Sequence, residues 1–156
     1  MGNRVVPSQW AVVEASARAL GLEPHLLDIR RPEDLPGAFE AASKRRVEGL
    51  LVGLDGVTQP NLRLIAELAA KHRLPGIYPS RDYPTRGGLM GYGSSDFHLY
   101  YRAATFADKI FKGAAPAELP VEQPTRWELV INLKTAKALG LTIPPSLMLR
   151  ADQVLE

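Results

Sequence analysis

Two patterns of apolar residues take turns along the first half of the chain, one typical of helices and one typical of strands. Over Ser8–Leu20 they recur every three or four positions and Gly21 follows, which predicts an amphipathic helix with a glycine stop. Val47–Leu54 is apolar almost throughout, which is typical of a strand covered on both faces. The elements predicted in this part are helices over Ser8–Leu20, Pro32–Arg46 and Pro60–His72, and strands over His25–Ile29, Val47–Leu54 and Leu74–Pro79.

Helices and strands that alternate at this spacing predict a parallel sheet. Parallel strands need crossover connections, and helices packed on the sheet usually supply them. The sequence therefore predicts an α/β fold with a parallel, doubly wound, Rossmann-like sheet flanked by helices.

The second half of the chain has a different pattern of predicted elements. A helix is expected over Asp96–Lys112, and Gly113–Thr125 contains three prolines that predict an extended crossing segment. The elements expected after it are a strand over Trp127–Leu133, a short helix over Lys134–Leu139, and a last helix that begins at Pro144-Pro145 and ends at Leu155.

The charge, cysteine content and length of the chain limit what it can bind and how it can fold. The net charge is +2, from 19 basic and 17 acidic residues scattered along the chain, so no basic stripe for nucleic acid is present. The chain has no cysteine, which excludes disulfides and thiolate metal sites. With 156 residues it is long enough to bury a core of its own.

The sequence contains no catalytic or metal-binding constellation. His25, His72 and His98 lie in unrelated segments without metal-ligand spacing. The glycine-rich Gly87–Gly93 lacks the Lys and Ser or Thr of a phosphate-binding loop. We therefore expect a protein that is not an enzyme and that holds no metal and no cofactor.

Five residues near the ends of predicted strands are candidates for ligand binding. Ligands of open α/β sheets bind outside the carboxyl ends of the strands. Asp55 offers a carboxylate for an amine, Ser80 a hydroxyl, and Arg81 a guanidinium for a carboxylate. Tyr83 offers an aromatic wall, and Tyr92 lies between two glycines that let a ligand approach.

Each candidate also has a structural interpretation. Asp55 is equally suited to being an ordinary turn acid. The loop with Arg81 and Tyr83 is also compatible with a solvated loop that holds a local Arg-Asp pair, and the glycines around Tyr92 with a simple turn.

One long segment resembles a known family. Leu119–Pro144, with the core Arg126-Trp127-Glu128-Leu129-Val130-Ile131-Asn132-Leu133-Lys134, resembles the C-terminal signature of the ABC transporter substrate-binding family related to tryptophan- and tyrosine-binding proteins. Gln9-Trp10, Ala69–Pro75, Gly87–Gly93 and Tyr100–Thr105 fit the same family, so the resemblance covers almost the whole chain.

The resemblance implies a type 1 periplasmic binding protein fold. Such proteins have two α/β lobes, a hinge of crossing strands and a ligand in the cleft between the lobes, and they are about twice as long as this chain. The chain then corresponds to a C-terminal part. Residues 1–93 form an α/β ligand-binding lobe, and residues 94–156 supply a helix, the proline-rich crossing segment and the C-terminal strand and helices of the same fold.

The function implied is that of the solute-binding component of a bacterial ABC importer. Its partners are a small amino-acid-like or other polar organic ligand and an ABC permease, and its location is periplasmic or otherwise extracytoplasmic. A freestanding α/β domain with a regulatory or enzymatic function is the alternative, because one fold serves many activities. Exposed strand edges and apolar faces further predict a homo-oligomer, formed through an exposed edge or a swapped segment.

Overall fold

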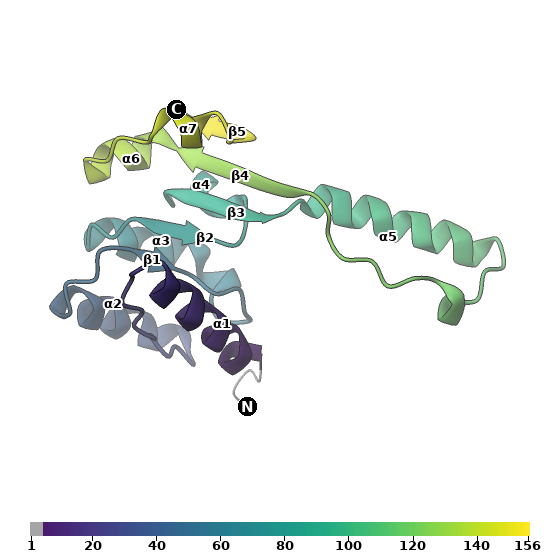
Figure 1. Cartoon of the computed structure of the whole chain (residues 1–156), viewed down its shortest axis with the longest axis horizontal. Helices are drawn as coiled ribbons and strands as arrows, with labels where there is room; N and C mark the ends of the chain where they lie inside the picture. The colour runs from purple at the N-terminus through teal and green to yellow at the C-terminus, as the bar shows by residue number, and fades with distance from the viewer. Residues whose placement is uncertain (1–4) are drawn as a thin grey trace.

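The computed structural model, which describes residues 5–156, is built on a five-stranded sheet (Figure 1). The strands are β1 (Leu50–Leu51), β2 (Gly76–Tyr78), β3 (Met90–Ser94), β4 (Trp127–Asn132) and β5 (Gln153–Leu155), and they lie in this order across the sheet. β1, β2 and β3 are parallel, β4 is antiparallel to β3, and β5 is parallel to β4. The predicted α/β class with a mostly parallel sheet is confirmed, and the β3–β4 pair is its antiparallel exception.

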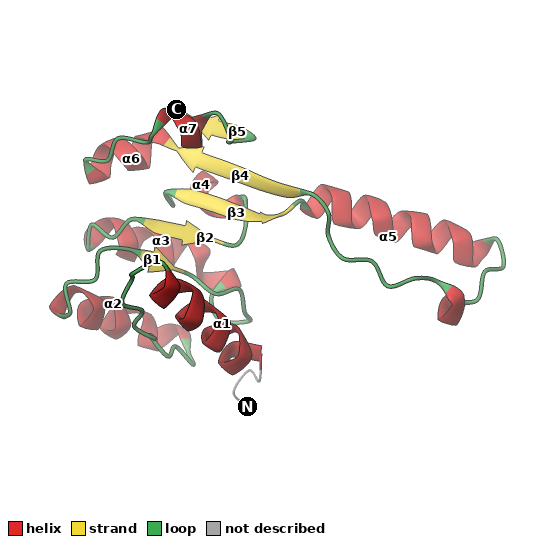
Figure 2. Cartoon of the chain, in the orientation of Figure 1, coloured by secondary structure: helices red, strands yellow, loops and turns green. Residues whose placement is uncertain are grey.

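Seven α-helices connect or extend these strands in the described part of the chain (Figure 2). They are α1 (Val5–Ala19), α2 (Leu35–Lys44), α3 (Leu62–Lys71), α4 (Asp82–Thr85), α5 (Asp96–Phe111), α6 (Leu133–Leu139) and α7 (Pro145–Met148). Residues 1–4, which precede the first predicted helix, lie outside the described residues.

The core lies between the sheet and the helices α2 and α3. Leu35, Phe39 and Ala42 on α2 and Ile65 on α3 are each at most 2% exposed. They repeat at the helical spacing that puts apolar residues on one face, so burial of that face fixes both helices on the sheet. Tyr78 at the end of β2 joins the same cluster.

Two predicted elements are wrong. His25–Ile29 forms no strand, and none of its backbone groups pairs with another strand in the described part of the chain, although Leu27 and Ile29 still pack against the core. The last helix ends at Met148, not at Leu155, because the chain turns there to pair with β4 as β5.

The strand prediction for Val47–Leu54 holds over Leu50–Leu51 only. Within residues 5–156, β1 is paired on one side alone, to β2. A strand with one neighbour keeps half of its ladder, so an apolar run predicts a longer strand than the available partner supports.

Two glycines of β3 let the loop after β2 lie directly against the sheet. A Cβ on Gly91 would collide with the carbonyl oxygen of Ser80, and a Cβ on Gly93 with that of Pro79. These contacts involve backbone atoms, which cannot move aside as a flexible side chain does. The close approach therefore requires glycine at both positions.

We expect Gly91→Ala to lower the free energy of unfolding by about 1–3 kcal/mol, because the added methyl group forces the Pro79–Ser80 backbone away from β3. Urea unfolding measures this change. Gly37→Ala on α2 is the control, since its Cβ meets no atom within 4 Å and alanine favours a helix by up to about 1 kcal/mol. Equal effects of the two substitutions would contradict the steric argument.

Candidate functional site

The register of the strands brings the carboxyl ends of β1, β2 and β3 to one edge of the sheet. Because β4 runs antiparallel to β3, it begins at this same edge, where Trp127 pairs with Ser94. The carboxyl edge, as we name this rim, therefore receives the residues after three strands and the first residues of a fourth.

Asp55 follows β1 and closes its own turn. Its Oδ1 accepts hydrogen bonds from the backbone N–H groups of Val57 and Thr58, each 2.8 Å long. The Thr58 hydroxyl donates in turn to the carbonyl oxygen of Gly53, at 2.7 Å. Asp55 thus has the geometry of a turn acid, with one oxygen used by the turn.

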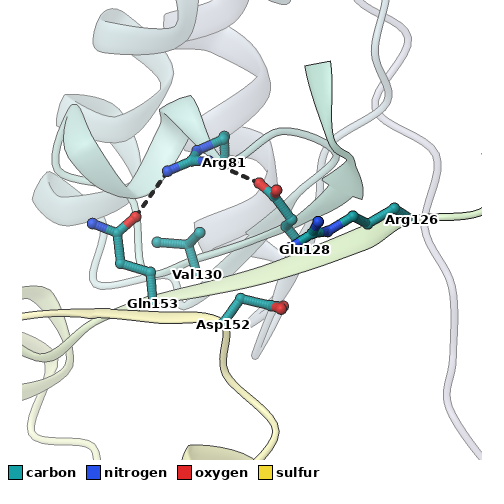
Figure 3. Close-up of a pocket in the computed structure, with 6 residues that line it drawn as sticks. All are labelled: Arg81, Arg126, Glu128, Val130, Asp152 and Gln153. Carbon is teal, nitrogen blue, oxygen red and sulfur yellow. Dashed lines mark hydrogen bonds and ion pairs between the residues drawn. The ribbon is translucent and has the colours of Figure 1, made fainter. Parts of the chain in front are cut away.

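Arg81 connects the loop after β2 to the two C-terminal strands (Figure 3). Its Nη1 lies 2.9 Å from Oε2 of Glu128 on β4, and its Nη2 donates to Oε1 of Gln153 on β5 at 3.0 Å. The partner is a distant glutamate, and not the neighbouring Asp82 that a local Arg-Asp pair would use. Ser80 accepts a hydrogen bond from the Asp82 N–H at 3.2 Å.

An open polar cavity lies beside this ion pair. Its volume is about 250 Å³, and Figure 3 shows the charged side chains around it. The lining residues are Arg81, Arg126, Glu128, Val130, Asp152 and Gln153. Both cationic and anionic groups face it, so it suits a small polar molecule with charges of both signs.

Tyr83 is a core residue in this structure. Its side chain is fully buried and stacks on Tyr78, with the ring centroids 4.4 Å apart. Burial raises the pKa of the Tyr83 phenol to about 12, and the nearby charge of Asp55 adds to the shift. Its hydroxyl has no hydrogen-bond partner among the described residues. Contact of this side chain with a ligand stays a prediction, and it requires the surrounding loop to open.

Tyr92 lies open on the sheet. It is 50% exposed and stacks on Trp127, which is 51% exposed, with the ring centroids 5.7 Å apart. Neighbouring residues of a strand point to opposite faces, and Gly91 and Gly93 face the loop after β2. Tyr92 and Trp127 therefore form an aromatic pair on the other face.

The five predicted residues thus do not gather into one cluster. Glu128 pairs with Gly93, so the Arg81–Glu128 ion pair lies on the face opposite to Tyr92. Both groups remain close to the carboxyl edge. Any ligand that touches Arg81 and Tyr92 together must lie across the rim of the sheet, and ligand binding by these residues remains a prediction.

Sequence reasoning missed Trp127 and Glu128 because it inspected only the residues that follow strands. A strand that enters from the carboxyl edge contributes its first residues instead. The proline-rich segment before Trp127 was the available signal, since it marks a chain that returns to the sheet.

Among residues 5–156, no three His, Asp or Glu side chains are grouped closely enough to hold a metal ion. Over the same range, no helix has both the length and the apolar character needed to cross a bilayer.

The chain matches a known protein family and a curated relative. The model of a family described as ABC transporter substrate binding protein matches residues 3–155. A tyrosine-binding protein of Clostridioides difficile is 24% identical over 96 residues, which are 62% of this chain and 28% of that protein.

Two solved structures show the same fold. One is a conserved domain protein of Vibrio cholerae, at a TM-score of 0.86 and 21% identity. The other is an ABC domain of Streptococcus pneumoniae in complex with L-Trp, at a TM-score of 0.86 and 23% identity. In both comparisons 96% of this chain is covered, but only 50% of the other chain, so this chain spans about half of their length.

We expect Arg81→Ala to lower the free energy of unfolding by about 1–3 kcal/mol, because it leaves the Glu128 carboxylate, whose side chain is 12% exposed, without its cation. Urea unfolding provides the measurement. In the exposed i,i+4 pair of α3, Arg63→Ala should change stability by less than about 0.5 kcal/mol. A loss for Arg81→Ala no larger than this control would show that the bridge is not structural.

Tyr83→Phe should leave stability at neutral pH unchanged or raised, because it removes a buried hydroxyl without a partner. The phenol has a pKa of about 12 in the fold against 10.0 for an unperturbed tyrosine. Ionisation of this group therefore leaves the free energy of unfolding unchanged below pH 10.0 and lowers it as the pH rises toward 12. The variant should lose less stability over that window in urea titrations. Tyr100→Phe, at a tyrosine that is 77% exposed, is the control and should behave as the unmodified protein does.

Proposed function

Since the chain belongs to the ABC transporter substrate-binding protein family, we propose that it is the C-terminal portion of a solute receptor that serves a bacterial ABC importer. In this role it holds one side of a small amino-acid-like ligand, and a second lobe closes on the other side. The observation that carries the proposal is the family match over residues 3–155.

The relatives favour an aromatic amino acid as the ligand. One of them is named for tyrosine and another contains L-Trp. The exposed pair of Tyr92 and Trp127 offers two ring faces on which an aromatic side chain stacks. The second oxygen of Asp55, Oδ2, is available at the same edge for an ammonium group.

The arrangement of the connections supports hinge closure as the mechanism. The chain leaves the sheet after β3 and returns before β4, and the Ser95 N–H donates to the Arg126 carbonyl oxygen at 3.1 Å across the two connections. Two adjacent connections form a narrow joint, which permits rotation without breaking the sheet. A ligand that contacts both lobes stabilises the closed state by its differential affinity.

In this proposal the division of the chain follows the joint. Residues 1–93 carry the α/β ligand-binding lobe, and residues 94–156 carry α5, the crossing segment and the C-terminal elements. β4 and β5 complete the sheet of the same lobe, because β4 pairs with β3 along five residues. An ABC permease as partner and an extracytoplasmic location are further parts of the proposal and follow from the family.

Titration calorimetry with L-Trp and L-Tyr tests the function. We expect weak or no binding by the 156-residue chain and clearly tighter binding once it is joined to a first lobe, because closure needs contacts from both sides. In the two-lobed protein, Tyr92→Ala should weaken the ligand at least about tenfold, equivalent to about 1.4 kcal/mol.

Tyr92→Phe keeps the ring and is the matched control, so it should retain most of the affinity. Arg81→Ala and Asp55→Ala test the charged contacts, with losses of about 1.5–3 kcal/mol each where a charged hydrogen bond is removed. A two-lobed protein that binds none of the common amino acids would refute the proposed ligand class.

A further inference from the structure

Two basic triplets lie side by side at the ends of the helices α2 and α3. Lys44-Arg45-Arg46 ends α2, and Lys71-His72-Arg73 ends α3. The two segments are far apart in the sequence, but Oγ of Ser43 lies 2.7 Å from Nδ1 of His72, and the ring centroids of Phe39 and His72 are 5.9 Å apart. The fold therefore joins into one basic surface two segments that the sequence shows only as scattered charge.

This surface has more cations than anions. Its five cations, which we name the basic patch, are Lys44, Arg45, Arg46, Lys71 and Arg73. All five are exposed, and none of them is ion-paired within residues 5–156. The exposed glutamates nearest to them in the sequence are Glu40, Glu48 and Glu67, and Glu67 is already paired with Arg63 at 3.1 Å. The basic patch therefore keeps a net positive charge.

The third residue of each triplet has a left-handed backbone. φ is 55° at Arg46 and 54° at Arg73, and within residues 5–156 these are the only non-glycine residues with a positive φ. Glycine ordinarily closes a helix in this conformation, as Gly140 does after α6. The helix dipole favours cations in the last turn, but it does not require arginine at the position where glycine is less strained. An arginine at both helix ends therefore indicates that the charge itself has a use.

The basic patch lies at the end of the sheet opposite to the carboxyl edge. Arg46 precedes β1 and Arg73 precedes β2, so both lie near the amino ends of these parallel strands. In Figure 1 the arrows of β2 and β3 point toward α5, so the amino ends of the strands lie away from that helix. The exposure of the basic patch therefore does not depend on what closes over the carboxyl edge.

We propose that the basic patch docks the chain on an anionic lipid surface. Phospholipid headgroups present a layer of negative charge, and a cluster of about four to eight Lys and Arg side chains binds such a layer. Each cation near the surface strengthens binding about fivefold, and the attraction extends over about 10 Å at about 0.1 M salt. Docking by this end leaves the carboxyl edge exposed for a ligand.

The composition of the surface favours lipid over protein or nucleic acid. No large hydrophobic side chain is exposed over residues 40–49 or 67–75. Protein interfaces have such side chains at their centre, and proteins that bind single-stranded nucleic acids stack exposed aromatic rings on the bases. Lipid headgroups require neither. The choice of lipid also rests on the proposed function, which puts the chain beside a membrane permease.

Co-sedimentation with lipid vesicles tests the proposal. At low salt, the 156-residue chain should bind vesicles of mixed phosphatidylcholine and phosphatidylglycerol, and it should not bind vesicles of phosphatidylcholine alone. Salt at about 1 M should release the chain, because it shortens the Debye length to about 3 Å.

Glycine at the two left-handed positions supplies the decisive variant. Arg46→Gly combined with Arg73→Gly removes two cations and should weaken binding to the anionic vesicles at least about tenfold. Glycine adopts these φ values without strain, so urea unfolding should show a stability that is unchanged or higher. A loss of binding in this variant is then not a result of unfolding.

The matched control removes the same amount of charge at other places. Lys112 lies at the end of α5, and Arg150 precedes β5, which begins at the carboxyl edge. Both side chains are exposed. Lys112→Gln combined with Arg150→Gln should bind the anionic vesicles nearly as well as the unmodified chain.

Three results would overturn the proposal. Equal losses in the two double variants would show a general effect of net charge, and equal binding to both kinds of vesicle would show that the lipid charge is not recognised. Binding to a short DNA duplex without binding to the anionic vesicles would assign the basic patch to another partner. Amino-acid binding by the two-lobed protein should not change in the glycine variant, because the basic patch lies away from the carboxyl edge. This proposal and the proposed function therefore fail separately.

Discussion

The antiparallel pairing of β3 with β4 is the interaction on which the rest of the structure depends. Five residue pairs, from Met90–Ile131 to Ser94–Trp127, join the parallel part of the sheet to the C-terminal strands. Asn132 strengthens the join because its side chain, which is 9% exposed, donates to the Pro84 carbonyl oxygen at 2.8 Å and caps α6 through Thr135. Beyond this pair, the C-terminal elements are joined to the rest of the fold by side-chain contacts such as those of Arg81 with Glu128 and Gln153.

The same pairing determines what each face of the carboxyl edge presents. The glycines of β3 admit the loop after β2 on one face, so Arg81 reaches Glu128 and Gln153 there. The other face keeps the aromatic pair of Tyr92 and Trp127. A charged bridge and an aromatic surface are thereby separated by the thickness of one sheet. Since Arg81 is used by its bridge to Glu128 and Gln153, the exposed pair of Tyr92 and Trp127 is the better surface for the proposed aromatic ligand.

The sequence predicted helices better than strands, for a physical reason. A helix satisfies its own hydrogen bonds, so the apolar periodicity of α2 and α3 was sufficient to locate them within a few residues. A strand needs a partner, and no local pattern in His25–Ile29 or Val47–Leu54 reports whether one is present. β5 was missed for the same reason, because Gln153–Leu155 is a strand only through its pairing with β4.

Candidate site residues were predicted from position along the chain, which does not determine the direction of a side chain. The rule for strand ends located the right edge, but it could not show that Tyr83 turns inward onto Tyr78 or that Asp55 holds its own turn. The inward direction of Tyr83 depends on α4, a four-residue helix that carries this residue and that no periodic pattern predicts. The Asp55 turn depends on hydrogen bonds to Val57 and Thr58, which the sequence does not show. Trp127 required knowledge of the direction of β4, which only the assembled sheet provides.

The helix α5 and the proline-rich segment after it are attached to the sheet at a single joint. The hydrogen bond between Ser95 and Arg126 holds the start of α5 beside the start of β4, so the two connections to the sheet run side by side at that point. Whatever covers the exposed aromatic side chains of α5 (Phe97, Tyr100, Tyr101 and Phe111) is therefore attached to the carboxyl edge through the same two connections. In the proposed two-lobed receptor, an apolar surface of this exposure is stabilised by burial against the first lobe.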